Sequence, residues 1–100
     1  MSRVKLSDEA RLVLISLSSG PKHGYAIAQD VQAFSGRSLG AGTLYGAIAR
    51  LEARGFIEAL AGDERRRPYR VTSAGARTLR GSVAELRKVE AVARRRLVTR

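Results

Sequence analysis

The chain has 100 residues and a formal net charge of +10, from 19 lysines and arginines against 9 aspartates and glutamates. A chain this short can form one modest core but leaves little material for an enclosed catalytic cavity. It contains no cysteine and a single histidine, His23, which excludes disulfides, thiolate nucleophiles and metal sites built from cysteine or clustered histidine. We therefore expect one small domain, or one domain plus an oligomerisation arm, with no metal, no cofactor and no enzymatic activity.

Hydropathy predicts the compartment of the protein, and its charge predicts the chemical class of its partner. No stretch approaches the roughly 20 apolar residues of a membrane span, and residues 1–7 lack the apolar core of a signal peptide. A soluble, cytoplasmic protein with no membrane partner is expected. Residues 1–60 carry a net charge of +2 and residues 61–100 a net charge of +8. Such a basic excess favours a polyanionic partner, either nucleic acid or an acidic membrane surface.

A first helix is predicted after Ser7, whose side chain can cap it, while Asp8 and Glu9 complement the positive end of the helix dipole. The helix should run to about Ser18, because residues 19–21, Ser-Gly-Pro, form a break. Its apolar residues cover more than one stripe, which indicates two apolar neighbours rather than one. They are Ala10, Leu12, Val13, Leu14, Ile15 and Leu17.

Two shorter helices are expected next, one over residues 24–35 and one from about Ala41 to Gly55. Gly36 ends the first of them, and Leu39 in the following turn is expected to fill the core. The apolar residues at helical spacing are Ile27, Val31 and Phe34 in the first and Leu44, Ala47, Ile48 and Leu51 in the second. Two helices joined by a tight, glycine-bearing turn have the size and order of a helix-turn-helix.

The periodicity then changes from helical to alternating, which predicts strands over residues 56–61 and 69–72. The arginine-rich segment between them would form the cationic tip of a hairpin. Thr72 is a suitable cap for a last helix over residues 73–97, whose apolar residues return every three or four positions.

This order of elements predicts a mainly α fold with a small β-hairpin. The layout is that of a winged helix-turn-helix DNA-binding domain, residues 1–73, followed by a long C-terminal dimerisation helix, residues 74–100. The apolar stripe of the last helix exceeds what so small a domain can cover, and each large side chain left in water forfeits about 1.5–3 kcal/mol. We therefore expect a homodimer. The predicted dimerisation residues are Leu12, Leu79, Val83, Leu86, Val89 and Leu97.

Several stretches, in this order and spacing, resemble the PadR family of bacterial transcriptional regulators over about residues 10–80. They are GPKHGYAI at 20–27, GTLYGAIARLE at 42–52, GFI at 55–57 and YRVTSAG at 69–75. The resemblance implies a dimeric winged-helix repressor with the third helix in the major groove, the wing near the DNA backbone or minor groove, and the last helix forming the dimer with help from the first. Two features depart from the family: Gly46 stands where proline is frequent, and the tryptophan that some members stack against aromatic drugs is missing.

The third helix has an almost bare face opposite its apolar side. That face is formed by Gly42, Tyr45, Gly46, Ala49 and Ala53, with Thr43 and Arg50 at its flanks. Small residues allow close approach to a groove floor but supply few hydrogen bonds to base edges. We therefore expect discrimination to depend on Thr43, Tyr45, Arg50 and DNA shape, and much of the affinity on the wing. The predicted DNA-binding residues are Lys22, Tyr25, Thr43, Tyr45, Arg50, Arg65, Arg66 and Arg67.

Each of these residues also has a structural interpretation. Tyr45 could pack on the wing, Tyr25 could cap a local carbonyl, and Lys22 could be an ordinary solvated lysine. The arginines at the hairpin tip could likewise be solvated. His23 is expected to form a hydrogen bond at a helix start rather than to bind a metal. The arginines at 94–96 are expected to interact with the negative end of the last helix.

The function that follows is a DNA-binding transcriptional regulator, a repressor that binds a pseudo-palindromic operator in duplex DNA as a homodimer. A small-molecule effector could bind between the first and last helices, but no residue of the sequence indicates the chemical class of that effector. The alternative is a non-catalytic winged-helix module that uses the long helix to bind a protein partner. A third hypothesis is packing of DNA or RNA without sequence preference. The cationic hairpin tip distinguishes the first hypothesis from the second, and sequence preference distinguishes it from the third.

Overall fold

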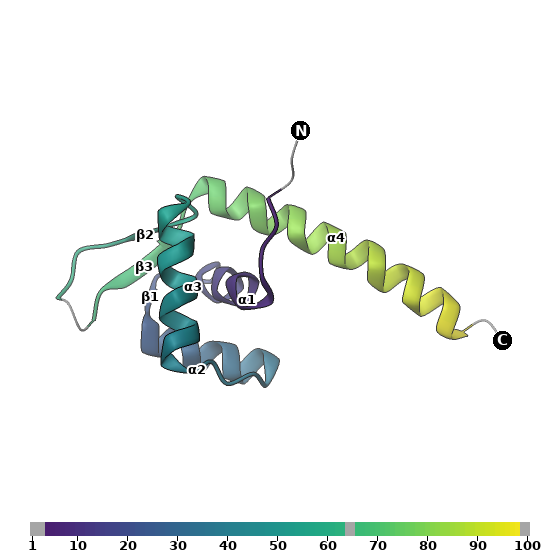
Figure 1. Ribbon diagram of the computed structural model, residues 1–100, viewed down its shortest axis with the longest axis horizontal. Coiled ribbons are helices and arrows are strands. Elements are labelled where there is room, and N and C mark those ends of the chain that lie inside the picture. The colour runs from purple at the N-terminus through teal and green to yellow at the C-terminus, as the bar shows by residue number, and fades with distance from the viewer. Residues whose placement is uncertain (1–3, 64–65, 99–100) are drawn as a thin grey trace.

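The computed structural model describes residues 4–63 and 66–98. Helices α1, α2 and α3 form a body beside a small sheet, and α4 extends from this body over most of its length (Figure 1), so the molecule measures 56 × 33 × 22 Å. The elements are α1 (Asp8–Leu17), β1 (Lys22–His23), α2 (Gly24–Ser35), α3 (Ala41–Ala53), β2 (Ile57–Ala59), β3 (Pro68–Val71) and α4 (Ser73–Val98). The predicted fold class is confirmed.

Helix α1 is the centre of the body. Ser7 caps it by accepting a hydrogen bond from the Ala10 N–H at 3.1 Å, as the sequence predicts. The helix packs against α2, α3 and α4 and also contacts β3. Val13 and Leu14 are fully buried, and Leu12 and Ile15 are half-buried against the core. The wide apolar surface of α1 therefore has several neighbours, which explains why its apolar residues do not form one stripe.

Helices α2 and α3 form the expected helix-turn-helix. His23 caps α2 through Nδ1, which accepts a hydrogen bond from the Ala26 N–H at 3.5 Å, so its predicted structural role is confirmed. Gly36 ends α2 with a φ of 78°, a conformation that glycine adopts without steric cost. In the following turn, half-buried Leu39 packs against the core. The core-facing side of the two helices is formed by Ile27, Val31, Leu44, Ala47, Ile48 and Leu51, whereas Phe34 near the end of α2 is exposed.

The sheet has three strands where the sequence predicts two. Its order is β1-β3-β2 and both pairings are antiparallel, with Lys22 opposite Tyr69 and Glu58 opposite Arg70. Strand β1 has only two residues, so it carries no alternating pattern, and the prediction assigned no element to Lys22 and His23. Strand β2, at Ile57–Ala59, is shorter than its predicted range, and β3, at Pro68–Val71, is shifted by one residue from its predicted range.

Helix α4 begins on the body and leaves it after about three turns. The Thr72 hydroxyl accepts a hydrogen bond from the Gly75 N–H at 3.1 Å and donates one to the Gly55 carbonyl at 2.7 Å, which confirms Thr72 as a cap. A Cβ atom on Gly75 would lie 2.0 Å from the Phe56 carbonyl oxygen, so only glycine permits this approach. Ser82 is the last buried residue of the helix. It accepts a 2.7 Å hydrogen bond from Arg11 Nε of α1.

Candidate nucleic-acid interface

Helix α3 presents one face to the core and the opposite face to solvent. Gly42, Thr43 and Ala49 are exposed, and Gly46 is half-buried. A Cβ atom on Gly42 would meet no other atom within 4 Å, so the start of this face is open. The structure therefore displays the bare surface that the sequence predicts for the third helix.

Tyr45 is the largest side chain on this face and is 48% exposed. Its hydroxyl lies against the first turn of α2, because a Cβ atom on Gly24 would be only 2.3 Å from Tyr45 Oη. The residue thus packs on α2 and leaves half of its surface to solvent. Gly24 is required for this arrangement, which couples the position of Tyr45 to the angle between the two helices.

Tyr25 is the most accessible aromatic residue of the described chain, at 67% exposed. Its hydroxyl accepts a hydrogen bond from Gln29 Nε2 at 3.3 Å, one turn further along α2. This hydrogen bond joins the phenol to a side chain of its own helix. Tyr25 projects from the first turn of α2 with its ring available to a partner.

Lys22 has a structural role in place of the predicted phosphate contact. Its ammonium donates hydrogen bonds to the Ser16 carbonyl at 2.5 Å, to Ser19 Oγ at 2.7 Å and to the Gly20 carbonyl at 3.4 Å. These carbonyls lie at and just beyond the end of α1, where helical carbonyls lack partners within the helix. Because the ammonium donates its hydrogen bonds at the C-terminal end of α1, Lys22 is not retained as a candidate DNA contact.

The hairpin between β2 and β3 is held by short-range contacts. The Leu60 N–H donates to the Pro68 carbonyl at 2.8 Å, and the Arg66 N–H donates to Asp63 Oδ1 at 2.8 Å. Along the strands, Arg70 Nε donates to Glu58 Oε2 at 2.5 Å and forms an ion pair with it. The cationic groups of the hairpin are therefore concentrated at its tip.

At that tip, Arg66 and Arg67 are exposed, as predicted, whereas Arg65 lies outside the described residues. Tyr69, at the base of the hairpin, is half-buried. Burial raises the pKa of its phenol, and the negative charge of Glu52 adds to the increase. Tyr69 therefore stays protonated at neutral pH as a packing residue between hairpin and body.

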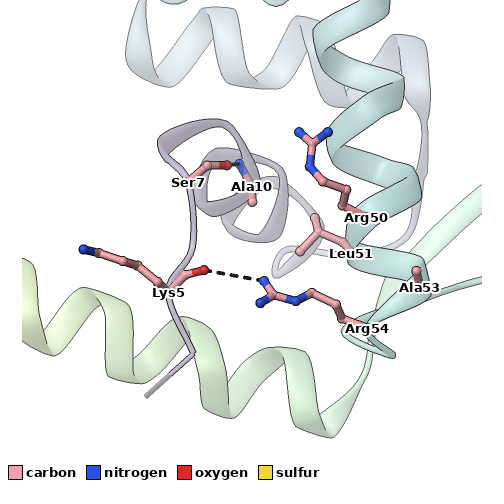
Figure 2. A pocket seen from close by; sticks show the side chains of 7 residues that line it. All are labelled: Lys5, Ser7, Ala10, Arg50, Leu51, Ala53 and Arg54. Carbon is pink, nitrogen blue, oxygen red and sulfur yellow. Dashed lines mark hydrogen bonds between the residues drawn. The ribbon is translucent and has the colours of Figure 1, made fainter. Parts of the chain in front are cut away.

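Arg50 extends from α3 toward the start of α1 (Figure 2), at the flank of the bare face. Nearby Glu9 forms a 2.9 Å ion pair with Arg37. The hydrogen bond from Arg37 holds the pKa of Glu9 below its ordinary value, and the charge of Arg50 contributes a smaller effect in the same direction. Arg54, one turn after Arg50, was not predicted as a site residue. The four-residue spacing of two arginines on one helix was the available signal.

The predicted dimerisation residues fall into two groups. Leu79 is buried and belongs to the core of its own chain, and Leu12 is half-buried against that core. The prediction for Leu79 needs correction, because its side chain is buried within the core of its own chain. The other predicted residues are exposed, together with two apolar residues that the prediction missed, Val92 and Val98. The exposed apolar residues of α4 are Val83, Leu86, Val89, Val92, Leu97 and Val98.

Residues 4–63 and 66–98 contain neither a membrane-spanning helix nor a cluster of metal ligands. None of the helices in these ranges is both long and apolar enough to cross a membrane. Nor do three or more histidine and acidic side chains gather there in a way that could hold a metal ion.

A helix-turn-helix followed by a two-stranded wing on a three-stranded sheet defines the winged helix-turn-helix class of proteins. Residues 13–81 match the transcriptional regulator PadR-like family, and this segment is more than half of the chain. The chain therefore belongs to the PadR-like family, which confirms the resemblance drawn from its motifs.

Solved structures agree with this assignment. A PadR family transcription regulator from Clostridium difficile R20291 is 28% identical, with a TM-score of 0.81 over 91% of this chain and 99% of that one. A PadR family transcriptional regulator from Eggerthella lenta is 33% identical, with a TM-score of 0.73 over 91% of this chain and 82% of that one.

One curated relative is much longer than this chain. It is described as an uncharacterized 37.1 kDa protein in a transposon of Streptomyces fradiae and is 46% identical over 72 residues. The match covers 72% of this chain but 21% of the relative, so the chain spans about a fifth of that protein's length.

Proposed function

We propose that this protein is a cytoplasmic transcriptional repressor that binds a pseudo-palindromic operator in duplex DNA as a homodimer. The observation that carries the proposal is the open face of α3, where Gly42, Thr43 and Ala49 are exposed beside half-exposed Tyr45. A helix with such a face can enter a major groove closely, because small side chains leave room for the base edges. Family membership supports the same conclusion.

Recognition would be divided between α3 and its surroundings. Thr43, Tyr45 and Arg50 are the polar groups at the open face and would contact base edges or adjacent phosphates. Tyr25, exposed at the start of α2, would reach the DNA strand that this helix crosses. The wing arginines would supply phosphate contacts, and these contribute affinity without sequence preference.

The homodimer is inferred from the exposed apolar face of α4. Its side chains include Leu86 and Val89, at 46% and 68% exposed, and burying each would contribute about 1.5–3 kcal/mol. A two-fold dimer would place two α3 helices about 34 Å apart on one side of the duplex, which suits an inverted repeat. We infer repression because a dimer covering two adjacent major grooves excludes polymerase from the same DNA.

Selection of bound duplexes from a random pool, with the purified protein, tests the proposal directly. An inverted repeat is the expected result, with affinity for it at least about 10³ above that for unrelated duplexes. Recovery of no preferred sequence despite tight binding would instead indicate nonspecific packing. Absence of any duplex binding at low salt would contradict the proposal and favour a protein-interaction module.

The contribution of the wing is tested by fluorescence anisotropy over a salt series. Replacing Arg65, Arg66 and Arg67 with alanine should flatten the slope of log affinity against log salt by roughly 2.7, if each residue contacts one phosphate. The matched control replaces the three arginines at 94–96, which removes the same charge from the far end of α4. Equal slopes for wing variant and wild type would contradict the assigned role of the wing.

A further inference from the structure

A hollow lies beside α3, at the point where α3 passes the start of α1 (Figure 2). Its volume is about 390 Å³, and it opens to solvent on one side. This volume falls within the range of sites that hold small organic molecules. The lining residues are Lys5, Ser7, Ala10, Arg50, Leu51, Ala53 and Arg54.

The upper and lower edges of the hollow are cationic. Arg50 lies in the last turn of α3 and Arg54 is the C-cap residue of this helix, and their side chains extend toward the start of α1 on either side of Leu51 (Figure 2). Arg54 donates a 3.5 Å hydrogen bond to the Lys5 carbonyl, and its guanidinium lies 5.6 Å from the centre of the Phe56 ring. These contacts orient the Arg54 guanidinium without neutralising its charge.

The two acidic side chains at the start of α1 already have partners. Asp8 forms a 3.0 Å ion pair with Arg11, and Glu9 forms a 2.9 Å ion pair with Arg37. Within the described ranges of the chain, neither Arg50 nor Arg54 forms an ion pair. The start of α1 adds the partial positive charge of a helix N-terminus at the same place. The charge of Arg50 also acts on nearby Glu9. Because Arg37 already forms an ion pair with Glu9, the two arginines still give the hollow an excess of positive charge.

Between the two arginines the surface is apolar. Buried Ala10 and Leu51, together with exposed Ala53, form a floor without hydrogen-bonding side-chain atoms. A free inorganic ion would leave this floor in contact with water, and a phosphate of a DNA duplex carries no apolar group to cover it. Two cationic edges around an apolar floor fit a ligand that has a charged head and a compact apolar body.

We propose that this hollow binds a small organic monoanion, whose carboxylate or phosphate ester head lies between Arg50 and Arg54 and whose apolar body covers Ala10, Leu51 and Ala53. Bidentate hydrogen bonding to such oxygens is the characteristic geometry of a guanidinium group. Binding of the ligand at this site does not require DNA, although Arg50 is shared with the open face of α3.

A regulatory consequence follows, and it rests on the proposed DNA-binding function. Arg50 belongs both to the hollow and to the flank of the open face of α3. A ligand head that holds the Arg50 guanidinium removes it from DNA and lowers operator affinity. Ligand and DNA would then compete for one side chain without any change of fold.

The binding experiment uses the full chain without DNA, and hexanoate as the probe. Titration followed by ¹H–¹⁵N NMR should perturb the amides of Ser7, Ala10 and Arg54. Hexanoate should bind about tenfold or more tightly than acetate, because each buried methylene adds to affinity. It should also bind about tenfold or more tightly than neutral hexanamide, which lacks the charge. In the variant Arg50→Gln/Arg54→Gln, hexanoate affinity should fall about tenfold or more. The matched control, Arg80→Gln/Arg87→Gln, removes two exposed charges from α4 and should bind like wild type.

Three results would overturn the site. They are equal binding of hexanoate and hexanamide, equal binding of hexanoate and acetate, and wild-type affinity in Arg50→Gln/Arg54→Gln. The comparison of probes on the wild-type chain decides the matter even if that variant fails to fold.

The regulatory consequence is tested separately, by duplex titration with and without saturating hexanoate. Hexanoate should weaken duplex binding of the wild type by about threefold or more and leave Arg50→Gln unchanged, as expected for the loss of one hydrogen bond to a phosphate or base. An unchanged duplex affinity in the wild type would overturn this consequence. Failure to bind any duplex would overturn the proposed function, while the NMR titration would still decide the ligand site.

Discussion

The two parts of α4 are alike in pattern and different in environment. Both carry apolar residues every three or four positions, yet residues 73–82 lie on the body of the chain whereas residues 83–98 project from it (Figure 1). In the first part Gly75, Leu79 and Ser82 are buried, and in the second no residue is. Helical periodicity therefore identifies a face that must be covered but not the surface that covers it.

The two parts of α4 also differ in the side chains that face a neighbouring surface. The first part uses small residues, since Gly75 meets the Phe56 carbonyl and Ser82 meets Arg11 of α1. The second part presents branched apolar side chains that would interdigitate with a surface of the same kind. This difference supports assigning the first part to the fold and the second to the proposed dimer.

The largest expected effect is on dimer stability, and it comes from placing charged residues on the apolar face of the second part of α4. The variant Leu86→Asp/Val89→Asp should raise the dimer dissociation constant at least about 10³-fold, or roughly 4 kcal/mol, because four carboxylates would be buried without partners. Sedimentation velocity measures this constant. The control Ala84→Asp/Ala91→Asp adds the same charge to other positions of α4 and should remain dimeric. Sedimentation of wild type as a monomer at micromolar concentration would remove the proposed dimer.

Gly75→Ala tests the contact that holds the first part of α4 against the body of the chain. The added methyl would need to lie 2.0 Å from a backbone oxygen, so α4 must move, at an expected cost of about 3 kcal/mol in the free energy of unfolding. Gly81→Ala, in the same helix, meets no other atom within 4 Å and should stabilise by up to about 1 kcal/mol. Urea unfolding at fixed protein concentration compares the two variants. Equal stabilities would mean that α4 does not dock as described.

Leu79→Ala and Leu97→Ala compare one apolar residue from each part. Leu79 belongs to the core, so its truncation should lower the free energy of unfolding by about 2–3 kcal/mol. Leu97 is 81% exposed, and its truncation should change that free energy by less than about 0.5 kcal/mol. Both are measured by urea unfolding in the Leu86→Asp/Val89→Asp background, so that only the folding of one chain is observed. Similar losses at both positions would contradict the division of α4.

The smallest effect is expected at the boundary between the parts. Ser82→Ala removes the acceptor of the Arg11 Nε hydrogen bond and should cost about 1 kcal/mol of unfolding free energy. Ser73→Ala, at an exposed position of the same helix, should change it by less than about 0.5 kcal/mol. Thermal unfolding followed by circular dichroism is sufficient. Indistinguishable midpoints would show that the Arg11 contact contributes nothing to docking.

Local signals predicted much of the fold. Ser7 and Thr72 cap the helices that their sequence positions indicate, and Gly36 ends α2 as expected. The open face of α3 was also predicted, because the side opposite a buried helical stripe is determined by periodicity alone. These features depend on residues within a few positions of one another.

Features that join distant residues were missed or misassigned. Strand β1 exists only because β3 lies beside it, and Lys22 turns back to the end of α1 instead of toward a partner. The packing of Tyr45 on Gly24 and the approach of Arg54 to the start of α1 likewise depend on how helices cross. A single sequence contains no signal for such contacts, since their energies arise only when separate elements meet.

The amino-acid sequence by itself determined the helices, their ends, the hairpin, the excess of positive charge and the family to which the chain belongs. All of these follow from short-range backbone preferences, periodicity and motif spacing. Only the tertiary structure decided that Leu79 is a core residue, that Lys22 serves α1 and that two arginines border an apolar hollow. Burial and charge compensation are properties of surfaces brought together by folding, and periodicity along one helix cannot specify the surface that it meets.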